Sequence, residues 1–326
     1  MSYKIAFITG ITGFVGSHLA DYLLNIGWAN YEIYGLARWR SPLDNIKHLL
    51  SNPRLHILHG DLNDPQSLHS ALSSIEQPDS VFHLAAQSYV PYSQIAPLAT
   101  MQTNIIGTLN LFDALLWRFP SVRVHVCSSS EVYGNPEITP IGESAPLHPV
   151  SPYSVSKAAM DLLAYQYYEN YAFKTIRTRA FTHTGPRRGD VFVASAFAKQ
   201  IAMAEKNHPD GATIRVGNLD SVRTWCDVRD MVDAYYLALR HGTPGEVYNV
   251  GGSETCTVGK MLDMLLAKSE LTNVEIKHDS NLFRPTDVTL QIPDISKFQR
   301  ETGWAPRYAL SDTLQDLLDY HRRKAQ

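Results

Sequence analysis

The sequence has few cysteines, no long apolar run and little excess charge of either sign. Its three cysteines, Cys127, Cys226 and Cys256, are scattered, so we expect neither a disulfide framework nor a zinc motif. No stretch approaches the roughly 18 apolar residues of a membrane span. Nothing reads as a signal peptide, so we expect a cytoplasmic protein. The net charge of −3 gives no reason to expect a nucleic-acid or membrane partner.

Metal-binding patterns are missing as well. The thirteen histidines include no HExxH or comparable spacing, so we expect no metal site. Hydrophobic residues make up 44% of the chain and charged residues 19%, the composition of an ordinary globular protein. At 326 residues the chain is long enough for two domains.

A glycine-rich turn lies between a strand and a helix near the N-terminus. Lys4–Thr9 has the pattern of a buried parallel strand, and helical spacing runs from Phe14 to Leu24. Glycines in a GxxGxxG spacing allow a tight turn and a close approach of backbone to a pyrophosphate. A plain glycine-rich turn is the alternative. Both flanks favour a dinucleotide site built from Gly10, Thr12, Gly13, Phe14, Val15 and Gly16.

The end of the second predicted strand, 31–37, indicates which dinucleotide binds. NAD sites place a carboxylate there for the ribose 2′-hydroxyl. This chain has Arg38, Arg40 and Ser41 instead, which suit a 2′-phosphate; the alternative is a pair of ordinary surface arginines. We therefore expect NADP. Residues after the third and fourth strands would complete the cofactor site, namely Asp61, Leu62, Leu84, Ala85, Ala86 and Gln87.

The segment Ser151–Lys157 predicts a helix with a phenol and an ammonium on one face. Ser151 is a good N-cap and Pro152 suits the first helical position. Tyr153 and Lys157 then lie one turn apart. A neighbouring ammonium favours phenolate, so this pair can move a proton to or from a sugar hydroxyl. Simple packing of the tyrosine with a snorkelling lysine is the alternative.

The order of elements predicts an α/β fold with a doubly wound parallel Rossmann sheet and a smaller, interwoven C-terminal α/β domain that binds substrate. We expect residues 1–180, with contributions from about 220–252, to bind the dinucleotide and residues 181–326 to bind substrate. Strand 246–250 would return to the main sheet. The other predicted strands are 4–9, 31–37, 54–60, 80–85, 122–127, 174–180 and 213–217. Predicted helices include 96–118, 192–207, 228–240, 257–268 and 310–322.

Taken together, these motifs resemble the extended short-chain dehydrogenase/reductase family of nucleotide-sugar enzymes, over essentially the whole chain. Within it the chain is most similar to GDP-mannose 4,6-dehydratases, with features of the GDP-4-keto-6-deoxymannose reductases. The segments that carry the closer resemblance are Arg187–Gly189 with Phe192–Val193, Gly217–Trp225, and Arg284–Val288. Ala196–Gln200, and the lack of a longer insertion before Arg284, look more like the reductase.

By this resemblance, Ser129-Ser130-Glu131 stands where the dehydratases have a Thr-Ser-Glu catalytic stretch. The fifth strand would deliver it to the carboxyl edge of the sheet, where such sheets bind ligands. Ser129, or Ser128, would hydrogen-bond the sugar O4, and the Glu131 carboxylate would take a proton from C5. Ser129 replaces the usual threonine. A serine-rich loop with a solvated glutamate is the alternative interpretation.

The resemblance also implies a substrate site and an oligomer. Arg187 and Arg188 resemble residues that approach a neighbouring subunit's cofactor region, so we expect a homodimer or homotetramer, with the 96–118 and Tyr153 helices as the interface. Thr182 stands where relatives usually have asparagine. Arg223 and Arg284 would hold the diphosphate and ribose of GDP, and Val193 would pack on the base. The full set of expected substrate-binding residues is Ser88, Ser129, Ser130, Thr182, Val193, Lys199, Arg223, Arg284 and Asp287.

The implied activity is an NADP-dependent 4,6-dehydration of GDP-mannose, in which Ser129, Glu131, Tyr153 and Lys157 act and the cofactor is recycled. Alternatives with the same tyrosine and lysine are a 4-keto reductase that consumes NADPH and a nucleotide-sugar epimerase. A non-catalytic NADP-sensing protein is a further alternative. Retention of Tyr153, Lys157 and Glu131 together argues against it.

Overall fold

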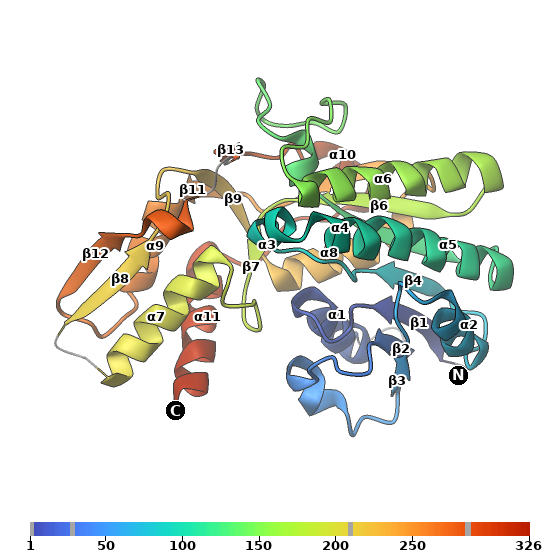
Figure 1. The fold of residues 1–326 in the computed structure, drawn as a ribbon, viewed down its shortest axis with the longest axis horizontal. Helices are drawn as coiled ribbons and strands as arrows, with labels where there is room; N and C mark the ends of the chain where they lie inside the picture. Colours follow the sequence, from blue (N-terminus) through green and yellow to red (C-terminus); the bar gives the residue numbers. More distant parts are fainter. Residues whose placement is uncertain (1–2, 27–29, 208–210, 284–287) are drawn as a thin grey trace.

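A seven-stranded parallel sheet forms the centre of the molecule (Figure 1). The computed structural model describes residues 3–26, 30–207, 211–283 and 288–326. The strand order is β10-β6-β5-β4-β1-β2-β3, so the order reverses between β1 and β4, which is where such sheets bind ligands. The strands are β1 (Lys4–Thr9), β2 (Tyr31–Ala37), β3 (Leu55–His59), β4 (Ser80–His83), β5 (Arg123–Ser129), β6 (Thr175–Ala180) and β10 (Val247–Val250).

Helices cover both faces of this sheet and bury a separate apolar cluster on each. On one face, α1 (Phe14–Asn25), α8 (Val228–His241), α10 (Ser296–Thr302) and the 3₁₀ turn η1 (Asp44–Leu49) pack on the strands. On the other face lie α2 (Pro65–Ser73), α5 (Gly107–Arg118) and α6 (Pro152–Tyr171). The strands are therefore buried on both sides, which explains their nearly continuous apolar sequences.

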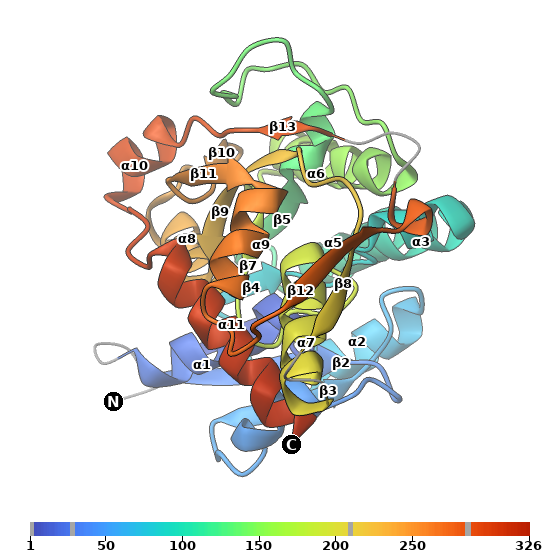
Figure 2. The ribbon, with the colours of Figure 1, turned by 90° about the vertical axis from the view of Figure 1, so that its left-hand side faces the viewer.

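A second lobe with its own apolar cluster lies beside the carboxyl edge of the sheet (Figures 1 and 2). It contains α7 (Val193–Asn207), β8 (Ala212–Val216), α9 (Val258–Leu266), β12 (Val274–His278) and α11 (Leu310–Ala325). A small sheet of β7 (His183–Thr184), β9 (Val222–Asp227), β11 (Glu254–Thr257) and β13 (Leu290–Gln291) connects the two parts. As predicted, β10 returns to the main sheet, pairing in parallel with β6.

The predicted helix 96–118 is present as an unbroken helical run from Pro97 to Arg118, but it contains a π-helical turn. Short helices α3 (Val90–Ile95) and α4 (Pro97–Met101) precede a π-helical turn, η2 (Gln102–Ile106), and α5 follows. The Gly107 N–H donates to the Gln102 carbonyl five residues back. A Cβ atom at Gly107 would lie 2.9 Å from the Leu62 Cβ, so glycine lets the helix pass close to the end of β3. Short 3₁₀ turns complete the fold at η3 (Ser130–Tyr133) and η4 (Ser280–Leu282).

Candidate active site

Only glycine fits at two positions of the turn after β1. Gly10 has a φ of +76°, and a Cβ atom there would lie 2.8 Å from the Ala85 nitrogen. At Gly16 a Cβ would lie 2.2 Å from the Gly10 carbonyl oxygen. Helix α1 then begins at Phe14, after Gly13, with no side-chain cap and no acidic residue in its first turn. The positive end of its dipole and its uncapped N–H groups suit a bound pyrophosphate.

The residues predicted to bind the adenosine half of the cofactor follow β2 and β3. Arg38 and Arg40 are exposed, and no ion pair engages either one within the described residues. Leu62, after β3, is buried, and its carbonyl accepts a hydrogen bond from Asn110 Nδ2 at 2.8 Å. The Asp61 carboxylate accepts a hydrogen bond from the Asn63 N–H at 2.9 Å and so caps the loop that follows β3. The predicted groups thus reach the same edge of the sheet as the glycine turn.

The segment Leu84–Gln87 after β4 is held rigidly against that turn. The N–H of Ala85 donates to Thr9 Oγ1 at 3.2 Å. The N–H of Gln87 donates to Asn104 Oδ1 at 2.8 Å, and Asn104 Nδ2 donates back to the Gln87 carbonyl at 3.0 Å. Asn104 therefore joins the helical layer to the sheet. It fixes the backbone that would lie beside the nicotinamide end of a dinucleotide.

Three of the predicted catalytic residues line one cavity of about 790 Å³, namely Ser129, Glu131 and Tyr153. The Ser129 hydroxyl lies close enough to the Tyr153 phenol to lower the pKa of that phenol. Ser128 turns instead toward the Lys157 carbonyl, at 3.4 Å. The alcohol beside the phenol is therefore Ser129. The N–H of Glu131 donates to Ser129 Oγ at 3.2 Å, which ties the acid and the alcohol into one turn at the end of β5.

Lys157 lies one turn from Tyr153, but its amine donates to the Cys127 carbonyl at 2.8 Å. Burial raises the pKa of Tyr153, and the nearby Ser129 hydroxyl and the charge of Arg188 only partly offset that shift. Burial also lowers the pKa of Lys157. Burial of the phenol therefore opposes the phenolate form, and the expectation that the Lys157 ammonium favours phenolate stays a prediction.

Helix α6 is capped so that Tyr153 falls in its first turn. The Ser154 N–H donates to Ser151 Oγ at 3.1 Å, and the Ser151 N–H donates to Ser154 Oγ at 2.9 Å, which forms a reciprocal capping box. Pro152 takes the first helical position, as the sequence predicts. The Tyr153 N–H donates to Ser93 Oγ at 3.1 Å. The caps therefore determine where along the cavity the phenol lies.

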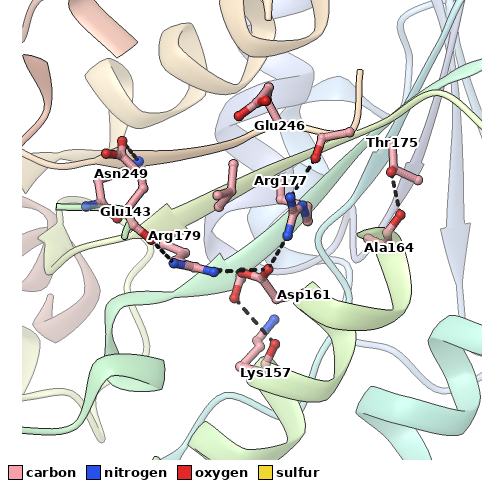
Figure 3. A network of polar contacts seen from close by, with 12 residues as sticks. Glu143, Lys157, Asp161, Ala164, Thr175, Arg177, Arg179, Glu246 and Asn249 are labelled. Atoms are coloured by element: carbon pink, nitrogen blue, oxygen red, sulfur yellow. Dashed lines mark hydrogen bonds and ion pairs between the residues drawn. The ribbon is translucent and has the colours of Figure 1, made fainter. Parts of the chain in front are cut away.

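A buried ionic network holds the same helix to β6 one turn beyond Lys157 (Figure 3). Asp161 is fully buried and accepts from Arg177 Nη1 and from Arg179 Nε, both at 2.8 Å. Arg179 Nη1 also donates to the Glu143 carbonyl at 2.9 Å. This network fixes the rotation of α6 about its axis, and with it the direction in which Tyr153 and Lys157 point.

The structure places five of the expected substrate-binding residues, beyond Ser129, on the walls of the large cavity. They are Ser88, Ser130, Thr182, Val193 and Arg223. Lys199 is not among them. It forms an ion pair with Asp190 and lines a smaller cavity of about 510 Å³ instead, because it lies on a different side of α7 from Val193. Arg284 and Asp287 lie outside the described residues.

Two residues beside the glycine turn were not predicted to form part of this site. The His183 ring stacks on the Phe14 ring, with centroids 6.0 Å apart and planes 7° apart. Burial, and then the charge of Arg188, lower the pKa of His183 to about 4, so the imidazole is neutral. The Arg188 guanidinium lies 5.0 Å over Phe14 and 3.6 Å over Phe192. His183 and Arg188 both belong to segments noted in the sequence analysis. Their positions along the chain do not show, however, that the two side chains lie against Phe14 of α1.

The expectation that Arg187 and Arg188 approach a neighbouring subunit stays a prediction, and both side chains also make contacts within their own chain. Arg187 is bound within its own chain, to His18, Asp21 and the Asn45 carbonyl. Arg188 lines both cavities of its own chain. These contacts arise because β7 pairs with β9 and the loop that follows β7 lies against α1. Among the described residues, no cluster of His, Cys, Asp or Glu is arranged to hold a metal ion, and no helix has the length and apolarity to cross a membrane.

The doubly wound sheet, the glycine turn and the paired tyrosine and lysine define the class of extended short-chain dehydrogenase/reductase enzymes. The structure is similar to that of RMD from Pseudomonas aeruginosa complexed with NADPH, with a TM-score of 0.84. The two sequences are 31% identical, and the match covers 98% of this chain and 99% of the other.

A family model described as GDP-mannose 4,6 dehydratase matches residues 7–317, and the chain belongs to this family. It is 32% identical to the GDP-mannose 4,6-dehydratase of Vibrio cholerae, a match that covers 100% of this chain and 95% of that one. It is 34% identical to the GDP-6-deoxy-D-mannose reductase of Pseudomonas aeruginosa, over 96% of this chain and 95% of the relative. The chain is therefore similar to both kinds of enzyme over nearly its full length.

Proposed function

We propose that the protein is an NADP-dependent nucleotide-sugar 4,6-dehydratase that converts GDP-mannose to GDP-4-keto-6-deoxymannose. The observation that carries this proposal is the position of Glu131. Its carboxylate lines the same cavity as Tyr153 and lies close enough that its charge contributes to raising the pKa of the phenol. A dehydratase needs a base for C5 as well as a group at O4, whereas a reductase needs only the proton donor at O4.

Several features of the protein fit NADP. The uncapped start of α1 and the close packing at Gly10 and Gly16 accommodate a pyrophosphate. Arg188 supplies a positive charge over Phe14, in the first turn of that helix. The exposed Arg38 and Arg40 suit a 2′-phosphate, and the chain has no acidic residue in the loop directly after β2, at 38–43.

The glycine turn with Arg38 and Arg40 would hold NADP, which would supply reversible hydride transfer at C4 and C6 of the sugar without being consumed. Tyr153 takes the O4 proton while Ser129 hydrogen-bonds O4 and orients it. Lys157 fixes the backbone at Cys127 and would hold the cofactor ribose. The C4 ketone makes the C5 proton acidic, and Glu131 removes it as the C6 hydroxyl leaves as water.

The cavity walls support a nucleotide-sugar substrate. Arg223 is suited to a diphosphate, since a guanidinium binds phosphate oxygens in a forked arrangement. Val193 offers an apolar surface for a base, and Thr182 and Ser88 offer hydroxyl groups to the sugar. By resemblance, Arg284 and Asp287 would contact ribose and guanine. These assignments make the second lobe the substrate-binding part, with the sheet and α8 as the dinucleotide-binding part.

The second candidate is the 4-keto reductase, favoured by the 34% identity to the Pseudomonas aeruginosa enzyme. In that reaction Tyr153 would donate a proton to O4 and NADPH would be consumed stoichiometrically. An epimerase would use the same tyrosine and lysine without needing Glu131.

Incubation with GDP-mannose and a catalytic amount of NADP⁺ separates the dehydratase from the reductase. A dehydratase forms a 4-keto-6-deoxy sugar with no lasting rise in the absorbance of reduced cofactor. The proposal fails if GDP-mannose is left unchanged while the purified keto sugar oxidises NADPH. Release of GDP-sugars that are only inverted at C4 would instead indicate the epimerase.

We also propose a homodimer or homotetramer that works in the cytoplasm. Helices α5 and α6 carry large exposed apolar side chains, including Trp117 at 76% and Leu162 at 55% exposure, and such surfaces are typical of interfaces between subunits. The three cysteines are all free, which suits a reducing compartment. Light scattering of wild-type protein and of Leu162→Asp tests the first part, since the charged variant should dissociate.

A further inference from the structure

The segment 183–190 crosses from the small connecting sheet to helix α1, and Arg187 makes the polar contacts of this crossing. Its Nη2 donates to Asp21 Oδ2 at 2.6 Å and to His18 Nδ1 at 2.7 Å. Its Nη1 donates to the Asn45 carbonyl at 3.1 Å. These acceptors belong to α1 and η1, so one guanidinium joins the loop to the dinucleotide-binding part at separate points.

His18 is a neutral member of this contact. Its side chain is largely buried, and burial together with the charge of Arg187 lowers its pKa to about 4. A neutral imidazole has one donor and one acceptor nitrogen. The tautomer that satisfies both neighbours carries its proton on Nε2, donates to the Pro186 carbonyl at 2.8 Å and accepts from Arg187 at Nδ1. Asp21 provides the balancing negative charge, with Arg187 only 14% exposed in the pair.

The backbone at Arg187 is in an uncommon conformation. Its φ is +70°, in the left-handed region that favours glycine. A strained residue persists where its surroundings hold it in place. The contacts of the Arg187 side chain explain why arginine stands at a position whose backbone alone favours glycine. The turn closes with the Arg188 N–H donating to the Gly185 carbonyl at 3.2 Å.

This local conformation decides where the next side chain goes. Arg188 extends over the Phe14 ring at 5.0 Å and the Phe192 ring at 3.6 Å. It therefore lies beside the start of α1, between the cavity that contains Tyr153 and the smaller cavity that contains Thr12. No carboxylate pairs with it within the described part of the chain, so its charge is available to an anion.

We propose that Arg187 is a positioning residue that fastens the 183–190 loop to α1, so that each chain completes its own cofactor site with Arg188. The loop thus serves the chain that carries it and not a neighbouring subunit. This inference rests on the proposed binding of NADP at the glycine turn. Arg187 itself lines the smaller cavity and is not among the residues that line the large one.

Titration of purified enzyme with NADPH, followed by the fluorescence of the nicotinamide, tests the positioning role. Arg187→Ala should weaken NADPH binding by about tenfold or more, since a partly buried charge pair loses one partner. At saturating cofactor, kcat should remain within about twofold of wild type, because the catalytic groups are untouched. Arg187→Lys and Asp21→Asn should give intermediate losses. They also keep the test valid if the alanine variant does not fold.

Arg322→Ala is the matched control. Arg322 makes a comparable forked contact with Glu205, at 2.7 and 2.8 Å, and is 26% exposed, but it joins α11 to α7 within the second lobe. The Arg322→Ala substitution should lower the free energy of unfolding without changing the affinity for NADPH. Equal affinity in wild type, Arg187→Ala and Asp21→Asn would overturn the inference. Failure of the wild-type enzyme to bind NADPH would instead defeat the proposed function, so the two failures are distinguishable.

Co-expression of two inactive or weakened chains tests whether the loop serves its own chain. Arg187→Ala chains are co-expressed with Glu131→Gln chains that carry a different tag. Hybrid oligomers are purified through both tags and assayed below saturating NADP⁺. If each chain completes its own site, the hybrid shows only the activity of its Arg187→Ala chains. Recovery of wild-type cofactor affinity in the hybrid would show that the loop reaches a neighbouring site, and would overturn the inference.

Discussion

Replacement of Asp161 by asparagine should destabilise the protein more than any change at an exposed ion pair. The carboxylate is fully buried and accepts from two guanidiniums, each at 2.8 Å, whose side chains are 8% and 6% exposed. Asparagine keeps the size of the side chain but removes the charge, and it leaves Arg177 and Arg179 as buried, uncompensated cations. Removing one partner of a buried ion pair costs about 3–5 kcal/mol. That is a large fraction of the about 5–15 kcal/mol by which proteins are usually stable.

Urea unfolding, followed by circular dichroism at neutral pH, measures this loss. Asp190→Asn is the control, because it breaks an ion pair with Lys199 in which both side chains are about half exposed, at 48% and 52%. Its expected cost is below about 1 kcal/mol. If Asp161→Asn costs no more than this control, then the network in Figure 3 does not hold α6 in place. A variant with apolar residues in place of Asp161, Arg177 and Arg179 would leave no buried charge. If that variant partly recovers the lost stability, the result supports the reasoning.

The remaining predictions concern the site and the pH. Glu131→Gln should abolish entry of solvent deuterium at C5, and labelled product from that variant would contradict its role. Arg38→Ser with Arg40→Ser should raise KM for NADP⁺ about tenfold or more while leaving KM for NAD⁺ unchanged, since only the 2′-phosphate loses partners. Burial lowers the pKa of His83 and of His125 from 6.5 to about 3, so the unfolded chain binds more protons in acid. Stability should therefore fall as pH drops from about 6.5 toward 3, by about 1.4 kcal/mol per pH unit for each histidine, which urea midpoints measure.

Local sequence was sufficient to predict the elements that carry the site. The strand–glycine–helix order around Gly10–Gly16 predicted the turn, and the structure explains it by backbone contacts that admit no Cβ. Ser151 and Pro152 predicted the start of α6 to the residue. The strands that were predicted agree with the structure within two residues, but β9, β11 and β12 of the C-terminal half were not predicted, and β7 and β13 are too short for a pattern. The caps of α6 and the approach of Gly16 to Gly10 join residues close in sequence, whereas Gly10 is also confined by the distant Ala85.

The pKa of Tyr153 and the position of Lys199 depend on parts of the chain that sequence spacing does not bring together. The i, i+4 spacing correctly placed Tyr153 and Lys157 on one face of α6, but burial of the phenol depends on the whole cavity wall. Lys199 shares a helix with Val193, yet the packing of α7 on α11 turns it toward Asp190. The π turn at η2 likewise follows from the approach of Gly107 to Leu62, contributed by a distant strand end.

The amino-acid pattern was enough to predict the class of fold and the start of α6, because periodicity and capping residues act locally, while the resemblance to the family supplied the proposed acid, alcohol, phenol and amine. Only the tertiary structure decided which serine meets the phenol, that Arg187 binds α1 of its own chain, and that Arg188 lies over Phe14. The two arginine positions depend on the pairing of β7 with β9, and the serine beside the phenol depends on the packing of α6 against β5. Such pairing is set by the packing of the whole molecule, and no local pattern contains it.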